Sequence, residues 1–386
     1  MFTVRRASDG ETIVVSDEES SSAESICRFL AYLTAKGYSP NTVVAYAHDI
    51  VHLLTFLTSQ RIDWTEFSAE RSVDFLLYLR STPSKRRHRD WTIRLAAQDG
   101  IAVPPSLSAA TINRILVAVS ALYDWAIFGG TFPGANPIAK IEDRISWRAT
   151  DRHRPFLAGI SPQKPEVRRL HLKTVRRLPR PMNDSQIAKL LSALRNLRDQ
   201  SLIMLMLNAG LRPGEALGLH LTDINYGRRR VLVRCRDDHP KGARSKSRTE
   251  RAVDLHDGGT LAALNAYVMG ERPAETSSPF VFLVGGASTH REEPLSYAGL
   301  ARMFARACER AGVRESWMTP HALRHTHATR MWEAGMRELT LQRRLGHASP
   351  ESTKIYTRVS DAVVVAEYRQ ALGLDRNRTP QNGERS

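Results

Sequence analysis

A proline-rich stretch without helical or strand periodicity, residues 131–180, divides the chain into two parts with different patterns. Before it, apolar residues recur three and four positions apart, which is the spacing of one helix face. After it, helical segments are mixed with short runs in which every second residue is apolar, as in a strand. A chain of 386 residues is also long enough for two domains. We therefore predict a mainly α fold with a small β-sheet, divided between two domains.

The predicted domain boundaries follow these changes of pattern. Residues 1–21 end in an acidic, serine-rich run with little apolar surface to bury, and we expect them to be disordered. The remaining divisions are a helical domain over residues 22–135, a basic linker over 136–180, a mixed α and β domain over 181–372 and a tail over 373–386.

Two helices of the first domain are indicated by their ends as well as by their periodicity. Ser39 and Pro40 are typical of an N-cap and a first helical residue, and apolar residues follow at spacings of four and three. A second helix is predicted over residues 111–128, because its apolar stripe stops at Gly129 and Gly130. The first domain is therefore predicted to be helical.

Short extended runs predict the sheet of the second domain. Val231, Val233 and Cys235 alternate with polar residues, and residues 252–255 and 280–284 are further apolar runs of strand length. The rest of this domain has helical periodicity. We therefore expect an α+β domain in which helices predominate.

The balance of charge indicates the class of partner. The chain has 56 Lys and Arg against 40 Asp and Glu, a net charge of +16, which favours a polyanion such as nucleic acid. Basic residues are concentrated in residues 84–100 and 164–180, where a solvated loop and a soluble tether are the alternative interpretations. The candidate ligands for DNA phosphates in and beside these segments are Arg86, Arg87, Arg89, Arg94, Arg176 and Arg177.

Cysteine usage and hydropathy indicate an intracellular protein. The separated Cys27, Cys235 and Cys308 form neither a disulfide framework nor a Cys-x-x-Cys metal site. The longest aliphatic run, residues 202–207, is too short to cross a bilayer, and the N-terminus lacks the apolar segment of a signal peptide. We expect a cytoplasmic protein without membrane attachment, bound metal or cofactor.

Two arginines stand at predicted helix starts, where phosphates bind readily. Arg212 precedes Pro213 in GLRPGE, and Glu215 follows in the first turn, where its carboxylate can orient the guanidinium. In TPHALR a threonine cap and a proline open a helix, which puts His321 in the first turn and Arg324 one turn later on the same side. We expect the two arginines to bind the nonbridging oxygens of one phosphate. The helix dipole disfavours protonated imidazole, so His321 should be neutral and able to act as a general base.

A phenol and a lysine complete this set. Tyr356 lies about two turns into a predicted helix, and His347 is in the loop before it. Attack by the phenol on a phosphodiester would give a covalent phosphotyrosine without metal or ATP. Lys246, between two predicted strands, is the candidate that protonates the leaving 5′ oxygen, and Lys241 is the alternative. Each residue alone has an ordinary structural explanation, but their joint order favours catalysis.

The ordered motifs GLRPGE, HALR and LGH, followed by the tyrosine, resemble the tyrosine recombinases, or phage-type integrases, over about residues 22–372. The resemblance implies a two-domain, C-shaped clamp around double-stranded DNA, with a helical core-binding domain and an integrase-type catalytic domain. The residues that it implies to be catalytic are Arg212, Lys246, His321, Arg324, His347 and Tyr356. In one departure, His327 stands where relatives often have an aromatic residue, and we expect it to pack in the core.

The same resemblance implies a site-specific recombinase that cleaves and rejoins DNA through a 3′-phosphotyrosine in integration, excision or transposition. The long insertion near residues 81–105 and the long linker are similar to those of mobile-element enzymes. The implied assembly is a homotetramer on two synapsed sites and a monomer or dimer otherwise, associated with the nucleoid and aided by DNA-bending proteins. The alternatives are a monomeric type IB topoisomerase that relaxes supercoils and a DNA-binding factor without catalysis. Stoichiometry on DNA and a cleavage assay distinguish them.

Overall fold

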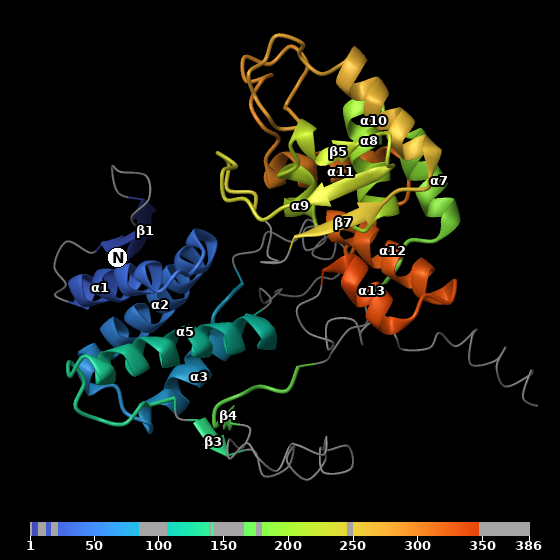
Figure 1. Ribbon diagram of the computed structural model, residues 1–386. Coiled ribbons are helices and arrows are strands. Elements are labelled where there is room, and N and C mark those ends of the chain that lie inside the picture. The colour runs from blue at the N-terminus through green and yellow to red at the C-terminus, as the bar shows by residue number, and fades with distance from the viewer. Residues whose placement is uncertain are drawn as a thin grey trace, which may run out of the picture. The chain divides into compact units, whose positions relative to one another are not determined.

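A computed structural model describes residues 2–6, 13–16, 22–84, 106–138, 140–142, 166–174, 180–244 and 250–346 (Figure 1). The chain forms two compact units, Met1–Arg176 and Arg177–Ser386. The division between the units falls within the segment that the sequence predicts as a linker, and the predicted limits of the flanking domains stay predictions.

The first unit is built from helices whose starts follow the sequence signals. Its helices are α1 (Ser22–Ala35), α2 (Pro40–Gln60), α3 (Arg71–Ser81) and α5 (Ala109–Phe128), with the short 3-10 helix η1 (Trp64–Glu66). Ser39 caps α2 by accepting a hydrogen bond from the Thr42 N–H, and Ser108 caps α5 in the same way. The α5 helix ends at Gly129. The two predicted helices are therefore confirmed.

The helices of this unit enclose one apolar core. Ile50 of α2 and Leu116 of α5 are fully buried, and the ring of Tyr123 stacks on Phe67 with centroids 5.6 Å apart. The hydroxyl of Tyr123 donates to the Trp64 carbonyl at 2.7 Å, so the buried phenol is satisfied. By length and composition α5 could cross a membrane, but 50% of its apolar stretch is buried inside the unit, as in the core helix of a water-soluble fold.

Strands at the N-terminus were not expected from the sequence. Residues within the part predicted to be disordered form an antiparallel pair, β1 (Thr3–Arg6) and β2 (Ile13–Ser16). Phe2 and Val15 are buried in the same core as α1 and α2. The apolar residues before the acidic run are therefore buried in the core with α1 and α2, which composition alone did not predict.

The chain returns to α5 after a second strand pair, β3 (Lys140–Glu142) with β4 (Glu166–Arg168). The Asn113 side chain of α5 donates to the Leu172 carbonyl and accepts from its N–H, each at 2.9 Å, as a paired strand would. Leu170 and Leu172 pack against the core of the unit. The described residues of the predicted linker thus include a segment that is anchored on the first unit.

The second unit surrounds a short sheet with helices. Its helices are α7 (Asp184–Ser192), α8 (Leu197–Ala209), α9 (Pro213–Leu217), η3 (Leu221–Asp223), α10 (Gly258–Gly270), α11 (Tyr297–Arg310), α12 (Pro320–Glu333) and α13 (Glu338–Leu345). Strands β5 (Ile224–Asn225), β6 (Arg230–Val233) and β7 (Arg251–Asp254) are antiparallel in that order. Val231 and Val253 face each other across β6 and β7 and are both buried. The predicted mainly α fold with a small sheet is confirmed.

One predicted strand is wrong. Residues 280–284 form only single bridges, between Phe280 and His220 and between Leu283 and Pro294, and β5 supplies the third strand instead. A short apolar run does not by itself separate a strand from an irregular buried segment.

Helix α8 is the central helix of the second unit. Leu202, Ile203 and Met206 are fully buried, and α8 packs against both α10 and α12 (Figure 1). It ends at Gly210, which has a positive φ of 65° and caps the helix by donating its N–H to the Met206 carbonyl. Arg212 lies two residues after Gly210, so the end of α8 determines the position of Arg212 at the start of the next helix.

Candidate functional site

Arg212 is held at the start of α9 by the carboxylate of Glu215. Glu215 Oε2 accepts a hydrogen bond from the Arg212 backbone N–H at 2.9 Å, and Oε1 accepts one from Nη1 at 2.7 Å. One carboxylate therefore closes the first helical turn and orients the guanidinium, the contact that the sequence predicted. The Glu215 side chain is fully buried, whereas 19% of the Arg212 side chain is exposed.

Arg324, one turn into α12, lies beside the same carboxylate. Its Nη1 donates to the Gly210 carbonyl and its Nη2 to the Leu345 carbonyl, both at 2.8 Å, and Nη1 is 3.7 Å from Glu215 Oε2. The Arg324 side chain is 4% exposed, whereas His321, on the preceding turn, is exposed. Thr319 occupies the N-cap position with extended backbone, but its side chain makes no capping hydrogen bond, contrary to the predicted cap.

Both arginines contact the same turn at the end of α13. Arg212 Nη2 donates to the Gly346 carbonyl at 3.0 Å. The Leu345 carbonyl accepts from Arg324 Nη2 at 2.8 Å and from Arg212 Nη1 at 3.5 Å. His347 is the next residue of the chain. The structure thus brings the two arginines together, as expected of guanidiniums that bind one phosphate.

A third arginine, which sequence reasoning did not include in the site, completes this cluster. Arg251 at the start of β7 donates from Nη2 and Nη1 to Glu215 Oε2 and Oε1 at 2.7 and 3.1 Å. Burial raises the pKa of Glu215, but hydrogen bonds and charge from Arg251, with the charges of Arg324 and Arg212, hold that pKa below its ordinary value. The carboxylate therefore stays ionised and offsets one of three positive charges. The residues next to Arg251 in the sequence do not indicate this contact, because Glu215 is far away in the chain.

His327 fixes the last turn of α13 through Arg344. The ring is 2% exposed, its Nε2 accepts from Arg344 Nε at 3.0 Å, and its Nδ1 therefore carries the proton and donates to the Leu207 carbonyl at 2.9 Å. Burial, and next the charge of Arg344, lower the pKa of His327 to about 3, so the ring is neutral. Arg344 also donates to the carbonyls of Asn208 and Asp254. The expected core position of His327 is confirmed, with a hydrogen-bonding role in addition.

Two glycines allow the close approaches on which the cluster depends. Gly210 has a φ of 65°, and a Cβ there would lie 2.4 Å from Cδ2 of His327. Gly346 has a φ of 64°, and a Cβ there would lie 2.6 Å from Nη1 of Arg251. A side chain at either position would therefore be strained, and it would displace His327 from Gly210 or the Arg251 guanidinium from Gly346.

Several predicted residues lie outside the described part of the chain, and their roles stay predictions. They are Lys246, His347 and Tyr356 of the catalytic set and Arg86, Arg87, Arg89, Arg94, Arg176 and Arg177 of the DNA-binding set. The alternative lysine, Lys241, is described, and its Nζ lies 2.7 Å from Glu293 Oε2.

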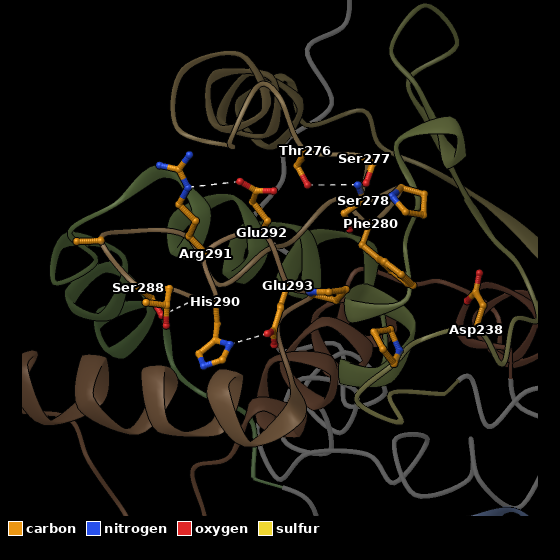
Figure 2. A pocket seen from close by; sticks show the side chains of 15 residues that line it. Asp238, Thr276, Ser277, Ser278, Phe280, Ser288, His290, Arg291, Glu292 and Glu293 are labelled. Carbon is orange, nitrogen blue, oxygen red and sulfur yellow. Dashed lines mark hydrogen bonds and ion pairs between the residues drawn. The ribbon is translucent and has the colours of Figure 1, made fainter. Parts of the chain in front are cut away.

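An open cavity of about 960 Å³ lies apart from this cluster, between residues 276–280 and 287–294. Figure 2 shows the His290 ring pointing toward the Glu293 carboxylate, with Nδ1 and Oε1 2.5 Å apart. The lining has both charge signs, and no predicted catalytic residue belongs to it. Over the described residues, no group of three or more His, Cys, Asp or Glu side chains could hold a metal ion.

The fold and the cluster together define a class of protein: a mainly helical, two-unit chain in which paired arginines are oriented by a buried carboxylate. Residues 180–362 match the phage integrase family, and residues 26–129 match the phage integrase N-terminal SAM-like domain. The chain belongs to the phage integrase family of tyrosine recombinases, as its motifs predicted.

Individual relatives extend over nearly the whole chain. Transposase A from transposon Tn554 of Staphylococcus aureus is 27% identical over 357 residues, which is 92% of this chain and 93% of the relative. Tyrosine recombinase XerC of Herpetosiphon aurantiacus is 26% identical over 349 residues, 89% of this chain and 93% of the relative. Among solved structures, the Tn1549 transposon integrase with a circular intermediate DNA has a TM-score of 0.58 at 19% identity and covers 89% of this chain and 99% of its own. This last likeness shows the fold.

Proposed function

We propose that this tyrosine recombinase is the site-specific recombinase of a mobile element, acting on double-stranded DNA through a covalent 3′-phosphotyrosine. The observation that carries the proposal is the convergence of Arg212 and Arg324 on the turn at residues 345–346, immediately before His347. We infer that His347, the next residue of the chain, donates to the same phosphate. The similarity to a transposase along 92% of this chain supports the mobile-element role.

The reaction exchanges one phosphodiester bond for another. The Oη of Tyr356 attacks phosphorus, its proton passes to His321, and the bond from phosphorus to the 5′ oxygen breaks as Lys246 protonates that oxygen. Arg212 and Arg324 bind the two nonbridging oxygens, where negative charge increases in the transition state. A 5′-hydroxyl of the partner strand then attacks the phosphotyrosine and restores the tyrosine. The phosphate ester is conserved throughout, so the reaction needs no ATP, and the protein cations replace a metal.

The described part of the basic segment supports a contact with the DNA backbone. After β4, Arg169 and Lys173 are exposed, while the alternating Leu170 and Leu172 pack against the core. An anchored chain that presents cations outward suits phosphates, which give affinity without sequence readout. Together with the predicted arginines of both basic segments, these cations would bind the phosphates of a duplex.

Strand exchange sets the proposed assembly. Two duplexes contain four strands to be cut and each tyrosine cuts one, so a homotetramer synapses two sites, and monomers or dimers occupy single sites. DNA-bending proteins would assist synapsis. This activity belongs in the cytoplasm, at the nucleoid.

A nicked duplex tests this chemistry. The short fragment released by cleavage diffuses away, so the strand cannot be rejoined and the covalent adduct accumulates. We expect the wild-type protein to form an adduct on Tyr356, detected by denaturing electrophoresis and peptide mapping, and Tyr356→Phe to form none while keeping its affinity for DNA. An adduct on Tyr356→Phe would refute the nucleophile. Supercoil relaxation by a monomer without strand exchange would instead support a topoisomerase.

A further inference from the structure

Arg251 is buried beside the same carboxylate as the two arginines that are proposed to bind phosphate. Its side chain is 7% exposed, and its two terminal nitrogens donate hydrogen bonds to both carboxylate oxygens of Glu215. Two parallel hydrogen bonds fix the plane of a carboxylate as well as its position. The plane of Glu215 in turn sets the direction of Arg212, which bonds to it through Nη1.

Arg251 also supports the turn that both phosphate-binding arginines contact. Its Nε donates to the Arg344 carbonyl at 2.9 Å, in the last turn of α13. Gly346 packs directly on the guanidinium, since any Cβ there would lie 2.6 Å from Nη1. One side chain therefore touches the two supports of the cluster, the Glu215 carboxylate and the backbone at residues 345–346.

The contacts of Arg251 separate it from the residues that bind substrate. Each of its three nitrogens donates within the protein, to Glu215 or to Arg344. Arg212 and Arg324 also donate within the protein, but they reach the carbonyls of residues 345–346, beside the predicted His347.

We propose that Arg251 is a positioning residue for DNA strand cleavage, which holds Glu215 and the turn at residues 345–346 so that Arg212 and Arg324 meet one phosphate. The proposal rests on the proposed function. Displacement of reacting groups by about 1 Å costs about 100-fold in rate, so loss of this support should affect cleavage far more than DNA binding.

Substitutions at Arg251 test this role in the full-length protein. We expect Arg251→Met and Arg251→Lys to form the covalent adduct on a nicked duplex about 100-fold more slowly than wild type, because neither side chain can make two parallel bonds. Their affinity for the same duplex should change less than about threefold, since Arg251 makes no proposed contact with DNA. Cleavage by Arg251→Met and Arg251→Lys at the wild-type rate would overturn the proposal.

Arg230→Met is the matched control. Arg230 lines the same cavity of about 740 Å³ as Arg251, on the neighbouring strand, but it pairs with Asp254 and its side chain is 40% exposed. We expect its cleavage rate to equal that of wild type. A loss as large as that of Arg251→Met would show a general effect of charge on this surface and would overturn the specific role.

Chemical rescue separates positioning from misfolding. The cavity gives a small solute access to position 251, so millimolar guanidinium should accelerate adduct formation by Arg251→Ala at least about tenfold, while equal methylammonium or sodium should not. A folded Arg251→Ala protein without guanidinium-specific rescue would contradict the proposal. Absence of any adduct with wild-type protein would instead refute the proposed function.

Discussion

Two buried carboxylates show how the surroundings of single residues decide their charge. Glu215 receives hydrogen bonds from two guanidiniums and lies near a third, and its pKa is held below the ordinary value despite burial. Asp49 on α2 is 1% exposed and has one cationic neighbour, Arg114, with Nη1 2.8 Å from Oδ2 but without hydrogen-bond geometry. Burial therefore outweighs the charge of Arg114 and raises the pKa of Asp49 to about 6.

Asp49 should make the stability of the first unit depend on pH. Its pKa in the folded state lies above the unfolded value, so its contribution is fully present below the unfolded pKa and is lost as pH rises through about 6. We expect Asp49→Asn to raise the free energy of unfolding at pH 8 by on the order of 2 kcal/mol. The same substitution should flatten the pH dependence of this free energy between the unfolded and folded pKa values of Asp49. Calorimetry of the first unit's transition measures both.

Asp74→Asn is the control for this effect, because Asp74 is an exposed carboxylate on α3 of the same unit. It should leave the pH profile unchanged. If Asp49→Asn lowered stability at pH 8, the ionised pair of Asp49 with Arg114 would be net stabilising and the raised pKa would be wrong.

At the scale of elements, one side chain substitutes for a strand. Asn113 of α5 both donates to and accepts from the backbone of Leu172, so a segment outside any sheet is held on α5. In this segment Leu170 and Leu172 pack against the core of the unit, whereas Arg169 and Lys173 are exposed. The proposed DNA contact of this segment therefore depends on a residue that carries no charge.

Asn113→Ala should weaken DNA binding without removing a cation. Freed from α5, Arg169 and Lys173 would pay a larger entropy cost to align with phosphates. We expect a lower affinity for DNA. The slope of log affinity against log salt concentration should also decrease in magnitude by up to about 2, because each of the two phosphate contacts contributes about 0.9. Titration by fluorescence anisotropy at several salt concentrations measures both quantities.

The double replacement Arg169→Ala with Lys173→Ala provides the comparison. If Asn113 acts through these cations, Asn113→Ala should add no further loss in that background. Additive losses would show that Asn113 affects DNA binding by another route.

At the scale of the whole molecule, the two units have separate cores. Among the described residues, one large apolar cluster draws its members from residues 2–138 and another draws its members from residues 182–323. No described residue of the first unit belongs to the core of the second. We therefore expect each unit to fold around its own core.

Fragments 1–176 and 177–386 should each fold, because each contains a complete core. We expect cooperative thermal unfolding of both by circular dichroism. Each fragment should bind DNA at least about 100-fold more weakly than the full chain, because connecting two binding units raises the effective concentration of the second. A fragment that does not unfold cooperatively would show that its core needs the other unit.

The features that the sequence alone determined are relations between residues close in the chain. Ser39 predicted the start of α2, and the three-residue spacing of Arg212 and Glu215 predicted their contact. The order of the motifs predicted the family. Helical periodicity, caps and first-turn contacts involve partners within about four residues, so local residue types suffice to predict them.

Only the tertiary structure showed how Arg251 and Arg344 enter the cluster and that residues 280–284 are not a strand. The acceptors that fix the arginines are mostly backbone carbonyls, such as those of Gly210 and Leu345. Every residue has a carbonyl, so no side-chain pattern marks the ones that will accept. Which carbonyls meet which guanidiniums is decided when distant segments pack together, and that information appears only in the folded chain.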